Sequence, residues 1–294
     1  MIGIFLTSII GVFEKTSIYF LTKDKNNQSI KIVLNYIIMT LLFFSISLIK
    51  YEKLDFSFIY DIKFYITMFL ENLIIYISLK NYNKQKNFSQ IAFAAFSSIY
   101  LIIILSYIYN KIFNLNGIIS TPYNSIEEVI GYSLFFALLT IIYFFDKIKA
   151  KDIKYPFLLL IYSIILVNTL YFSITLIKLY QSFLVYSFLF ITLSIHFYFQ
   201  KINECKETIT IKKIKTKNTF LYILSYFFTF ILSIMAGNLI PVEFFAIFKR
   251  IGSIIGAVFI DIFLLNKKKV MNKKDVIVII LIIISSLYLY LSKI

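Results

Sequence analysis

Apolar residues gather in long runs along this chain, and short polar stretches separate one run from the next. The runs are about 16 to 24 residues long. At about 1.5 Å per residue of α-helix, such a run is close to the roughly 30 Å thickness of a hydrocarbon core. We therefore predict one membrane-spanning helix over each run. The ten predicted spans are Ile2–Leu21, Ile32–Ile49, Phe64–Leu79, Ile91–Tyr109, Val129–Phe145, Phe157–Ile177, Ser182–Phe199, Phe220–Leu239, Val242–Leu265 and Val276–Leu291.

The composition agrees with a bilayer as the solvent. Sixty per cent of the residues are apolar and only 15% are charged, and the charges cluster in the connectors. Runs of this length cannot all be hidden in one water-soluble core. The first run has no basic region before it and no small-residue cleavage site, so we interpret it as a retained span. The sequence thus predicts an all-α, multi-pass protein of the cell membrane, with no separate soluble domain.

Lysine is distributed unevenly between the two sets of connectors. Loops after odd-numbered spans carry 21 lysines, whereas loops after even-numbered spans and the C-terminus carry six. The positive-inside rule then puts the lysine-rich loops in the cytoplasm and both termini outside. The net charge of +15 is explained by lipid contact rather than by nucleic acid, for which no binding motif is present. Tryptophan is absent, so we expect the 23 tyrosines to supply the interfacial belt.

The two halves of the chain, residues 1–150 and 151–294, repeat weakly. Ala94–Ser98 in the fourth span aligns with Ala246–Arg250 in the ninth, and Tyr107–Lys111 corresponds to Ile262–Lys267. Each pair occupies the fourth position of a five-span block. Because five is odd, the second block enters the membrane from the opposite side. Inverted repeats of this kind build transporters with a midplane site at their interface.

Ionisable residues within spans are rare and costly, and they are the first candidates for function. Arg250 is the only arginine among 30 basic residues, and it lies near the middle of the ninth span. Its planar guanidinium binds carboxylate or phosphate in a bidentate way and stays charged in a dry site. It is therefore a candidate to grip an anionic substrate group. The alternative is a buried ion-pair partner for Glu71, Glu14 or Asp261.

Lys249 precedes Arg250 and is a second candidate for substrate binding. It shares a helix face with Gly252 and Gly256, whose spacing permits another helix to approach closely. The repeat alignment makes Ser97 and Ser98 the counterparts of the Lys–Arg pair, so we also assign them to the substrate site. The alternatives are simple helix packing for Lys249 and hydrogen bonds within their own helix for the two serines.

Glu71 and Glu14 are the candidates for proton coupling, because a carboxyl in a low-dielectric cavity can exchange a proton near neutral pH. Asn72, next to Glu71, is an uncharged polar companion assigned to substrate binding. The alternative for Glu71 is a fixed ion pair with Lys15 or Lys249.

Several classes of chemistry have no support in the sequence. A single cysteine, Cys205, excludes an intramolecular disulfide, and a single histidine, His196, excludes a histidine-based metal cluster. There is no P-loop for ATP hydrolysis, and no serine-hydrolase or zinc-protease motif. We therefore expect no cofactor, no metal and no enzymatic activity.

The stretch from Ala236 to Tyr290 resembles the drug/metabolite transporter superfamily, in its EamA-like ten-helix branch. It has a small-residue helix ending in Ala236-Gly237, a turn at Pro241, the run Lys249–Ser253, and a short charged turn at Lys267–Lys269 before a last apolar helix. Asn72–Tyr109 looks like the matching part of the first repeat. Length, span count and the five-plus-five arrangement extend the resemblance loosely over the whole chain. An acidic residue that often follows the fourth and ninth helices is missing.

The resemblance implies ATP-independent transport of a small organic metabolite, such as an amino acid, through a central cavity between the repeats. It also implies cytoplasmic termini, which conflicts with the lysine distribution. Our leading hypothesis is a secondary transporter of a small polar or anionic metabolite. The alternatives are a membrane-embedded enzyme acting on lipid-linked substrates, with Glu71, Glu14 or Asp261 as acid or base, and a scaffold that has no sealed polar cavity.

Overall fold

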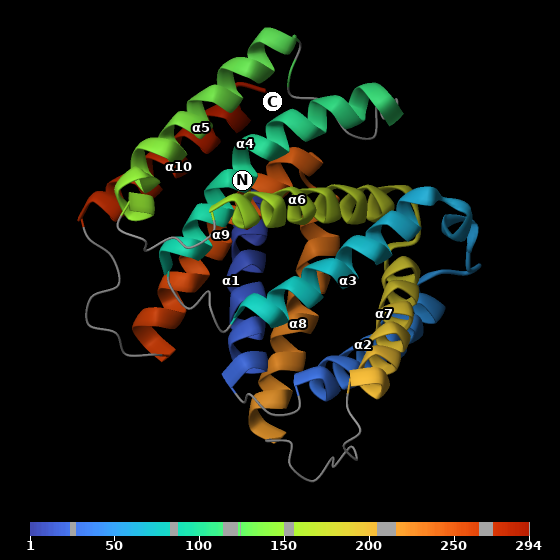
Figure 1. The fold of residues 1–294 in the computed structure, drawn as a ribbon. Coiled ribbons are helices and arrows are strands. Elements are labelled where there is room, and N and C mark those ends of the chain that lie inside the picture. Colours follow the sequence, from blue (N-terminus) through green and yellow to red (C-terminus); the bar gives the residue numbers. More distant parts are fainter. Residues whose placement is uncertain are drawn as a thin grey trace.

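The computed structural model describes residues 1–23, 28–82, 88–113, 123, 125–149, 156–204, 216–264 and 273–293. Within these ranges the chain forms ten α-helices and no β-strand (Figure 1). A 3-10 helix, η1 (Ser57–Tyr60), precedes α3, and a π-helical turn, η3 (Ile260–Leu264), follows α9. The helices are α1 (Ile2–Lys23), α2 (Gln28–Lys50), α3 (Ile62–Tyr82), α4 (Phe88–Phe113), α5 (Ile126–Lys149), α6 (Pro156–Leu179), α7 (Ser182–Glu204), α8 (Thr216–Gly237), α9 (Val242–Phe259) and α10 (Lys273–Leu291).

Each predicted apolar run forms one of these helices, and most helices extend a few residues beyond the run. Proline and glycine mark three of the ends. Pro156 is the first residue of α6, where its missing N–H costs no hydrogen bond. Gly237 ends α8, and Pro241 precedes the first residue of α9. The ninth run differs from the prediction, because α9 ends at Phe259 and the chain continues as the π-helical turn.

The architecture is that of a helical membrane protein. Six helices, α1, α2, α4, α5, α6 and α8, are long and apolar enough to cross a membrane. α9 is shorter and carries three ionisable side chains, which makes it the least lipid-like of the central helices. Large apolar side chains face outward around the bundle, as they do where lipid replaces water. They include Leu41, Phe69, Ile142, Phe157, Phe220, Ile277 and Ile284.

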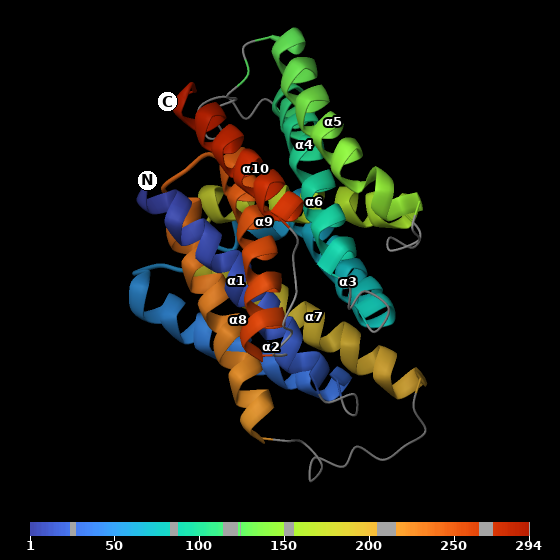
Figure 2. The ribbon, with the colours of Figure 1, turned by 90° about the vertical axis from the view of Figure 1, so that its left-hand side faces the viewer.

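The pairs of helices that pack together follow a regular pattern in the order of the chain. α1 packs along α8 and α9, and α6 packs along α3 and α4 (Figures 1 and 2). The second set of pairs follows from the first when each helix is replaced by the one five positions away in the chain. The pair of α1 with α8 then becomes α6 with α3, and the pair of α1 with α9 becomes α6 with α4. The pairs α2 with α7, α4 with α9 and α5 with α10 are unchanged by this exchange. Most of the main contacts therefore cross between residues 1–150 and 151–294, whereas the contact of α4 with α5 stays within the first range.

Glycine sets the closest of these contacts, between α1 and α9. A Cβ added to Gly252 would collide with the backbone of Ser8, and one added to Gly256 would lie 2.8 Å from the Cα of Val12. A Cβ on Gly11 of α1 would collide with the backbone of α9 in the same way. The close approach predicted for Gly252 and Gly256 is thus present, and its partner is the first helix of the chain.

Candidate functional site

The glycine contact between α1 and α9 brings three ionisable side chains together in the middle of the bundle. Glu14 lies one turn beyond Gly11 on α1, and Lys249 and Arg250 lie just before Gly252 on α9. Lys249 Nζ is 3.0 Å from Glu14 Oε2, and Arg250 Nη1 is 3.8 Å from Glu14 Oε1. Because both cations face one carboxylate, the cluster carries one positive charge in excess when all three groups are ionised.

A cavity of about 140 Å³ lies against this cluster. That space holds several water molecules or a small organic molecule. Its wall is mostly apolar, with the three charged groups and Glu71 on one part of the lining. The polar and ionisable lining residues come from α1, α2, α3, α6, α8 and α9: Glu14, Ser17, Tyr36, Glu71, Tyr162, Thr169, Tyr222, Tyr226, Thr229, Lys249 and Arg250.

Arg250 is the most incompletely satisfied group of this cavity. Its side chain is 2% exposed, and its Nε and Nη2 atoms are buried without a hydrogen-bond partner among the residues that the structure describes. A guanidinium offers five N–H donors, and a buried donor left unpaired costs about 1–3 kcal/mol. The ion pair with Glu14, the alternative given for Arg250, therefore involves only the Nη1 atom of the guanidinium. The remaining donors can bind an anionic group that enters the cavity.

Glu71 lines the same cavity from α3 but stands apart from the ion pairs. Glu14, Lys249 and Arg250 all act on it electrostatically, yet none of the described cations lies within 4.0 Å of its carboxylate. The fixed ion pair with Lys15 or Lys249 is absent from this conformation. Glu71 is therefore a carboxyl in a largely apolar cavity, close to a cationic cluster and free of a direct partner.

Tyrosines of α2 and α8 form another part of the wall, and the sequence analysis missed them. Tyr226 Oη donates to Tyr36 Oη at 3.5 Å, and Asn35 Nδ2 donates to Tyr222 Oη at 3.4 Å. We expected the tyrosines in an interfacial belt, and for these three that expectation is wrong, because Tyr36 and Tyr222 are buried in the bundle and Tyr226 is partly buried against its core. The signal available in the sequence was the spacing of Tyr222 and Tyr226, which puts both on one helix face.

The remaining predicted site residues lie outside the cavity lining. Asn72 donates to the carbonyl of Met68 in its own helix at 2.8 Å. Ser98 donates to the carbonyl of Ala94 at 2.7 Å, which is the alternative we gave for it, and Ser97 is fully buried beside it. Substrate binding by these three residues stays a prediction. The side chain of Asp261 is outside the described part of the chain.

The cavity reaches toward one end of the bundle. Its lining includes Ile18 and Leu21 near the end of α1, Ile32 near the start of α2, and Tyr162 and Tyr222 in the early turns of α6 and α8. These are the helix ends from which the lysine-rich loops leave in the sequence. We refer to the ends of α1, α2, α6 and α8 at Lys23, Gln28, Pro156 and Thr216 as the open end.

The opposite end is closed, and no lining residue of the cavity lies there. It contains Gly3 of α1 next to Ile240 of the turn before α9, and Lys178 of α6, whose Nζ donates to the carbonyl of Ile240 at 3.0 Å. Every α6 side chain from Tyr171 to Ile177 is buried, as is every α9 side chain from Val242 to Phe248. We refer to the surroundings of Gly3, Lys178 and Ile240 as the closed end.

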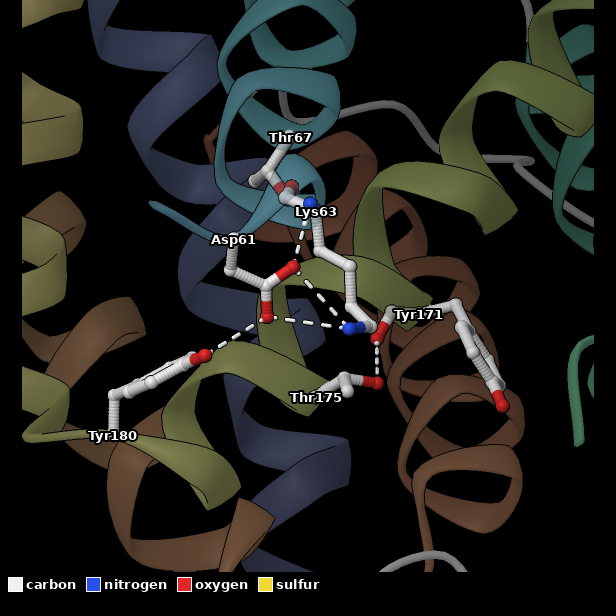
Figure 3. Close-up of polar contacts among 6 residues, drawn as sticks. All are labelled: Asp61, Lys63, Thr67, Tyr171, Thr175 and Tyr180. Carbon is white, nitrogen blue, oxygen red and sulfur yellow. Dashed lines mark hydrogen bonds and ion pairs between the residues drawn. The ribbon is translucent and has the colours of Figure 1, made fainter. Parts of the chain in front are cut away.

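A polar network joins α3 to α6 at the closed end (Figure 3). Asp61 precedes α3 and accepts three bonds from Lys63: the backbone N–H donates to Oδ1 at 2.9 Å, and Nζ donates to both Oδ1 and Oδ2 at 3.2 Å. Tyr180, just beyond α6, donates its hydroxyl to Oδ2 of Asp61 at 3.1 Å. Burial and this bond to Asp61 raise the pKa of Tyr180. The network fixes the start of α3 against the end of α6.

Comparison with known proteins adds no relative. No family model, no curated protein and no solved structure matches this chain. The resemblance to EamA-like transporters rests on the residues quoted from the sequence and stays a prediction. Across the described helices, no three histidine, cysteine, aspartate or glutamate side chains are grouped so that they could hold a metal ion.

Proposed function

We propose that this chain is an ATP-independent secondary transporter in the cell membrane, which moves a small polar or anionic metabolite such as an amino acid. The observation that carries the proposal is Arg250, a buried guanidinium with two unpaired nitrogens at a cavity in the middle of the bundle. In this proposal Arg250 binds the carboxylate of the substrate. Lys249 holds Glu14 and contributes to the positive field, and the apolar and tyrosine wall covers the rest of the substrate.

The pairing of the helices supports two inverted five-helix repeats, residues 1–150 and 151–294. In this proposal a twofold axis in the membrane plane relates each helix to the one five positions later. Most of the strong contact pairs fit that rule, and the pair of α4 with α5 is the exception, because α9 and α10 touch much less. The site then lies at the interface of the repeats. Rocking of one group of helices against the other would open the closed end and shut the open end, with the cavity between them.

Glu71 is the proposed proton-coupling residue at the cavity. Glu14 is the ion-pair partner of Lys249 and Arg250, and the substrate carboxylate would compete with Glu14 for Arg250. A substrate carboxylate on Arg250 would bring a second negative charge near Glu71, so that Glu71 takes up a proton more readily. Substrate and proton would then bind together.

The cavity favours transport over the two alternatives. A scaffold has no use for a cavity lined by unpaired cationic donors. A lipid-processing enzyme needs its acid–base groups at the membrane surface, whereas Glu14, Arg250 and Glu71 lie in the middle of their helices.

Purified protein in detergent and in proteoliposomes tests the proposal. We expect some members of a panel of L-amino acids and small carboxylates to raise the midpoint of thermal unfolding, and the same compounds to enter proteoliposomes without ATP. Arg250→Gln should weaken binding roughly tenfold or more, because hydrogen bonds to a charged group contribute about 1.5–3 kcal/mol. Arg250→Lys keeps the charge but loses the bidentate fork, so it should recover binding only in part.

Lys217→Gln is the matched control, because Lys217 is exposed at the start of α8. It removes one positive charge and should leave binding and uptake unchanged. Wild-type uptake no faster than that of empty liposomes for the whole panel, with no thermal shift, would reject the transporter function. Uptake that Arg250→Gln leaves intact would remove Arg250 from the site.

A further inference from the structure

A second buried carboxyl, Glu243, lies at the closed end of the helix that carries Arg250. Seven residues separate the two in the sequence, so they share one face of α9 and are about 10 Å apart along its axis. Glu243 is 0% exposed and does not line the cavity. Between them α9 presents Ala246 and Ile247, both buried. An apolar layer thus separates Glu243 from the cavity.

Polar groups without partners converge on this carboxyl. Both oxygens of Glu243 are buried and accept no hydrogen bond from the described residues, and within the same part of the chain Asn110 Nδ2 and Tyr123 Oη are buried without a hydrogen-bond partner. Asn110 of α4 lies close enough to the Glu243 carboxyl to interact with it, and Tyr123 lies within its electrostatic reach. Buried polar groups of this number are seldom left unpaired unless they take up a ligand or change partners during function.

Three further titratable side chains lie near Glu243 or its neighbours, two of them on α6 and one on α5. Lys178 of α6 acts on Glu243 electrostatically, but its Nζ donates to the carbonyl of Ile240 and makes no ion pair with Glu243. Tyr171 of α6 donates to Asn110 Oδ1 at 3.3 Å, and Figure 3 shows it directed away from Asp61 and Lys63. Glu128 of α5 acts on Tyr123 and is paired with Lys293.

These surroundings suit a proton better than a metal ion. The ammonium of Lys178, the amide hydrogens of Asn110 and the hydroxyl of Tyr123 are all donors, and they repel a cation. Apart from the Glu243 carboxyl itself and the tyrosine hydroxyls, the nearby oxygens are Asn110 Oδ1 and the carbonyl of Ile240, and each already accepts a hydrogen bond. A fully buried carboxylate without a partner is very costly, whereas the neutral carboxyl is tolerated.

We propose that Glu243 is a proton-binding site of the closed end, which holds its proton in this conformation and releases it when that end opens. The proposal rests on the transporter function proposed above and adds a second protonation site to it. On release, the O–H bond of the carboxyl breaks, the proton passes to water at the opened end, and the electron pair stays on the carboxylate. The Lys178 ammonium then leaves the Ile240 carbonyl and pairs with Glu243.

Glu243 and Glu71 thus lie on opposite sides of the apolar layer. Glu71 lines a cavity that reaches the open end, and Glu243 belongs to the end that is shut. A conformational change that exchanges the two ends would expose one carboxyl while it buries the other, which is what proton-coupled alternating access requires.

Infrared spectroscopy of the purified protein tests the protonation state without any substrate. At neutral pH the wild type should show a protonated-carboxyl band that shifts in heavy water. Subtraction of the Glu243→Gln spectrum should assign that band to Glu243. Glu127→Gln is the matched control, because Glu127 is an exposed carboxyl near the same end. A band of equal size in wild type and Glu243→Gln would mean that Glu243 is ionised, and it would overturn the proposal.

Proteoliposomes test the role in coupling, with a radiolabelled mixture of the common amino acids as the probe. Glu243→Gln should retain exchange of internal for external amino acid and lose accumulation driven by a pH gradient. Glu243→Asp keeps a carboxyl and should recover part of that accumulation. Full gradient-driven accumulation by Glu243→Gln would overturn this proposal and leave transport intact. Failure of the wild type to transport would instead reject the proposed function, and the infrared band would still decide whether Glu243 binds a proton.

Discussion

Gly252 of α9 faces the backbone of Ser8 of α1 so closely that no methyl group fits between them. The contact fixes the position of α1 relative to α9 along the helix axes, and it therefore determines that Glu14 lies opposite Lys249. The ion cluster of the cavity depends on this backbone contact as much as on charge, because a shift of one helix by a single residue would move Glu14 by about 1.5 Å.

Gly252→Ala should destabilise the protein by about 1–3 kcal/mol, the usual cost of adding a methyl group to a tightly packed contact. The midpoint of thermal unfolding in detergent measures the effect. Gly131→Ala in α5 is the control, since nothing lies within 4 Å of an added Cβ there. It should leave the midpoint unchanged or raise it slightly, because alanine favours a helix. Equal midpoints for the two variants would contradict the close contact.

Glu14→Gln should lower stability by roughly 3 kcal/mol, because it leaves the cations of Lys249 and Arg250 buried without their carboxylate. The double variant Glu14→Gln with Lys249→Gln should be more stable than the sum of the single variants predicts, since it also removes one unpaired charge. Unfolding in denaturant measures both. Strictly additive losses would show that Glu14 and Lys249 do not interact in solution.

Cysteine accessibility should distinguish the two ends of the bundle. In a background where the only native cysteine, Cys205, is replaced by serine, Ile18→Cys faces the cavity and should react with a membrane-impermeant maleimide from the side of the lysine-rich loops. Thr7→Cys, fully buried toward the closed end, should resist the reagent from both sides. Comparison of right-side-out and inverted vesicles then decides between the lysine distribution and the family resemblance. Rapid reaction of Thr7→Cys alone would reverse the assignment of the open end.

Ser57→Ala should change how stability depends on pH in acid. The backbone N–H and the hydroxyl of Ser57 each donate to the Asp55 carboxylate at 2.9 Å, and they lower the pKa of Asp55 below its ordinary value of 3.8. A lowered pKa contributes stability that is present above the ordinary value and is lost as the pH falls below it. The wild type should therefore unfold at a higher temperature than the variant near pH 7, and this difference should shrink in acid. A difference independent of pH would exclude Asp55 as the cause.

The sequence predicted the helices well, because apolar runs report local burial and each run here is bounded by polar or helix-ending residues. Gly252 and Gly256 were correctly assigned to a close helix contact. All of these inferences use only residues within one helix.

The partners of those residues were not predictable, because they come from distant parts of the chain. Nothing local indicates that Gly252 meets Ser8, or that Glu14 and not Glu71 is the acid that pairs with Lys249. Tyr36 and Tyr226 are of the residue type expected at a membrane interface, and only the packing of α2 and α8 in the bundle shows that they line the cavity. The polar groups around Glu243 come from α4 and α6 and from the segment before α5, so the lack of an ion-pair partner for Glu243 could not be recognised from the sequence of α9 alone.

The pairing of α1 with α8 and α9 has a consequence for how the protein is made. The first helix to leave the ribosome has its main partners among the last, so at about 5–20 residues per second it waits roughly 10 to 50 seconds for them. During that time Glu14 is in the membrane without Lys249 or Arg250. The nascent chain therefore passes through a period in which a helix with a charged side chain in its middle needs protection by the insertion machinery, and variants that delay α9 should be degraded rather than merely inactive.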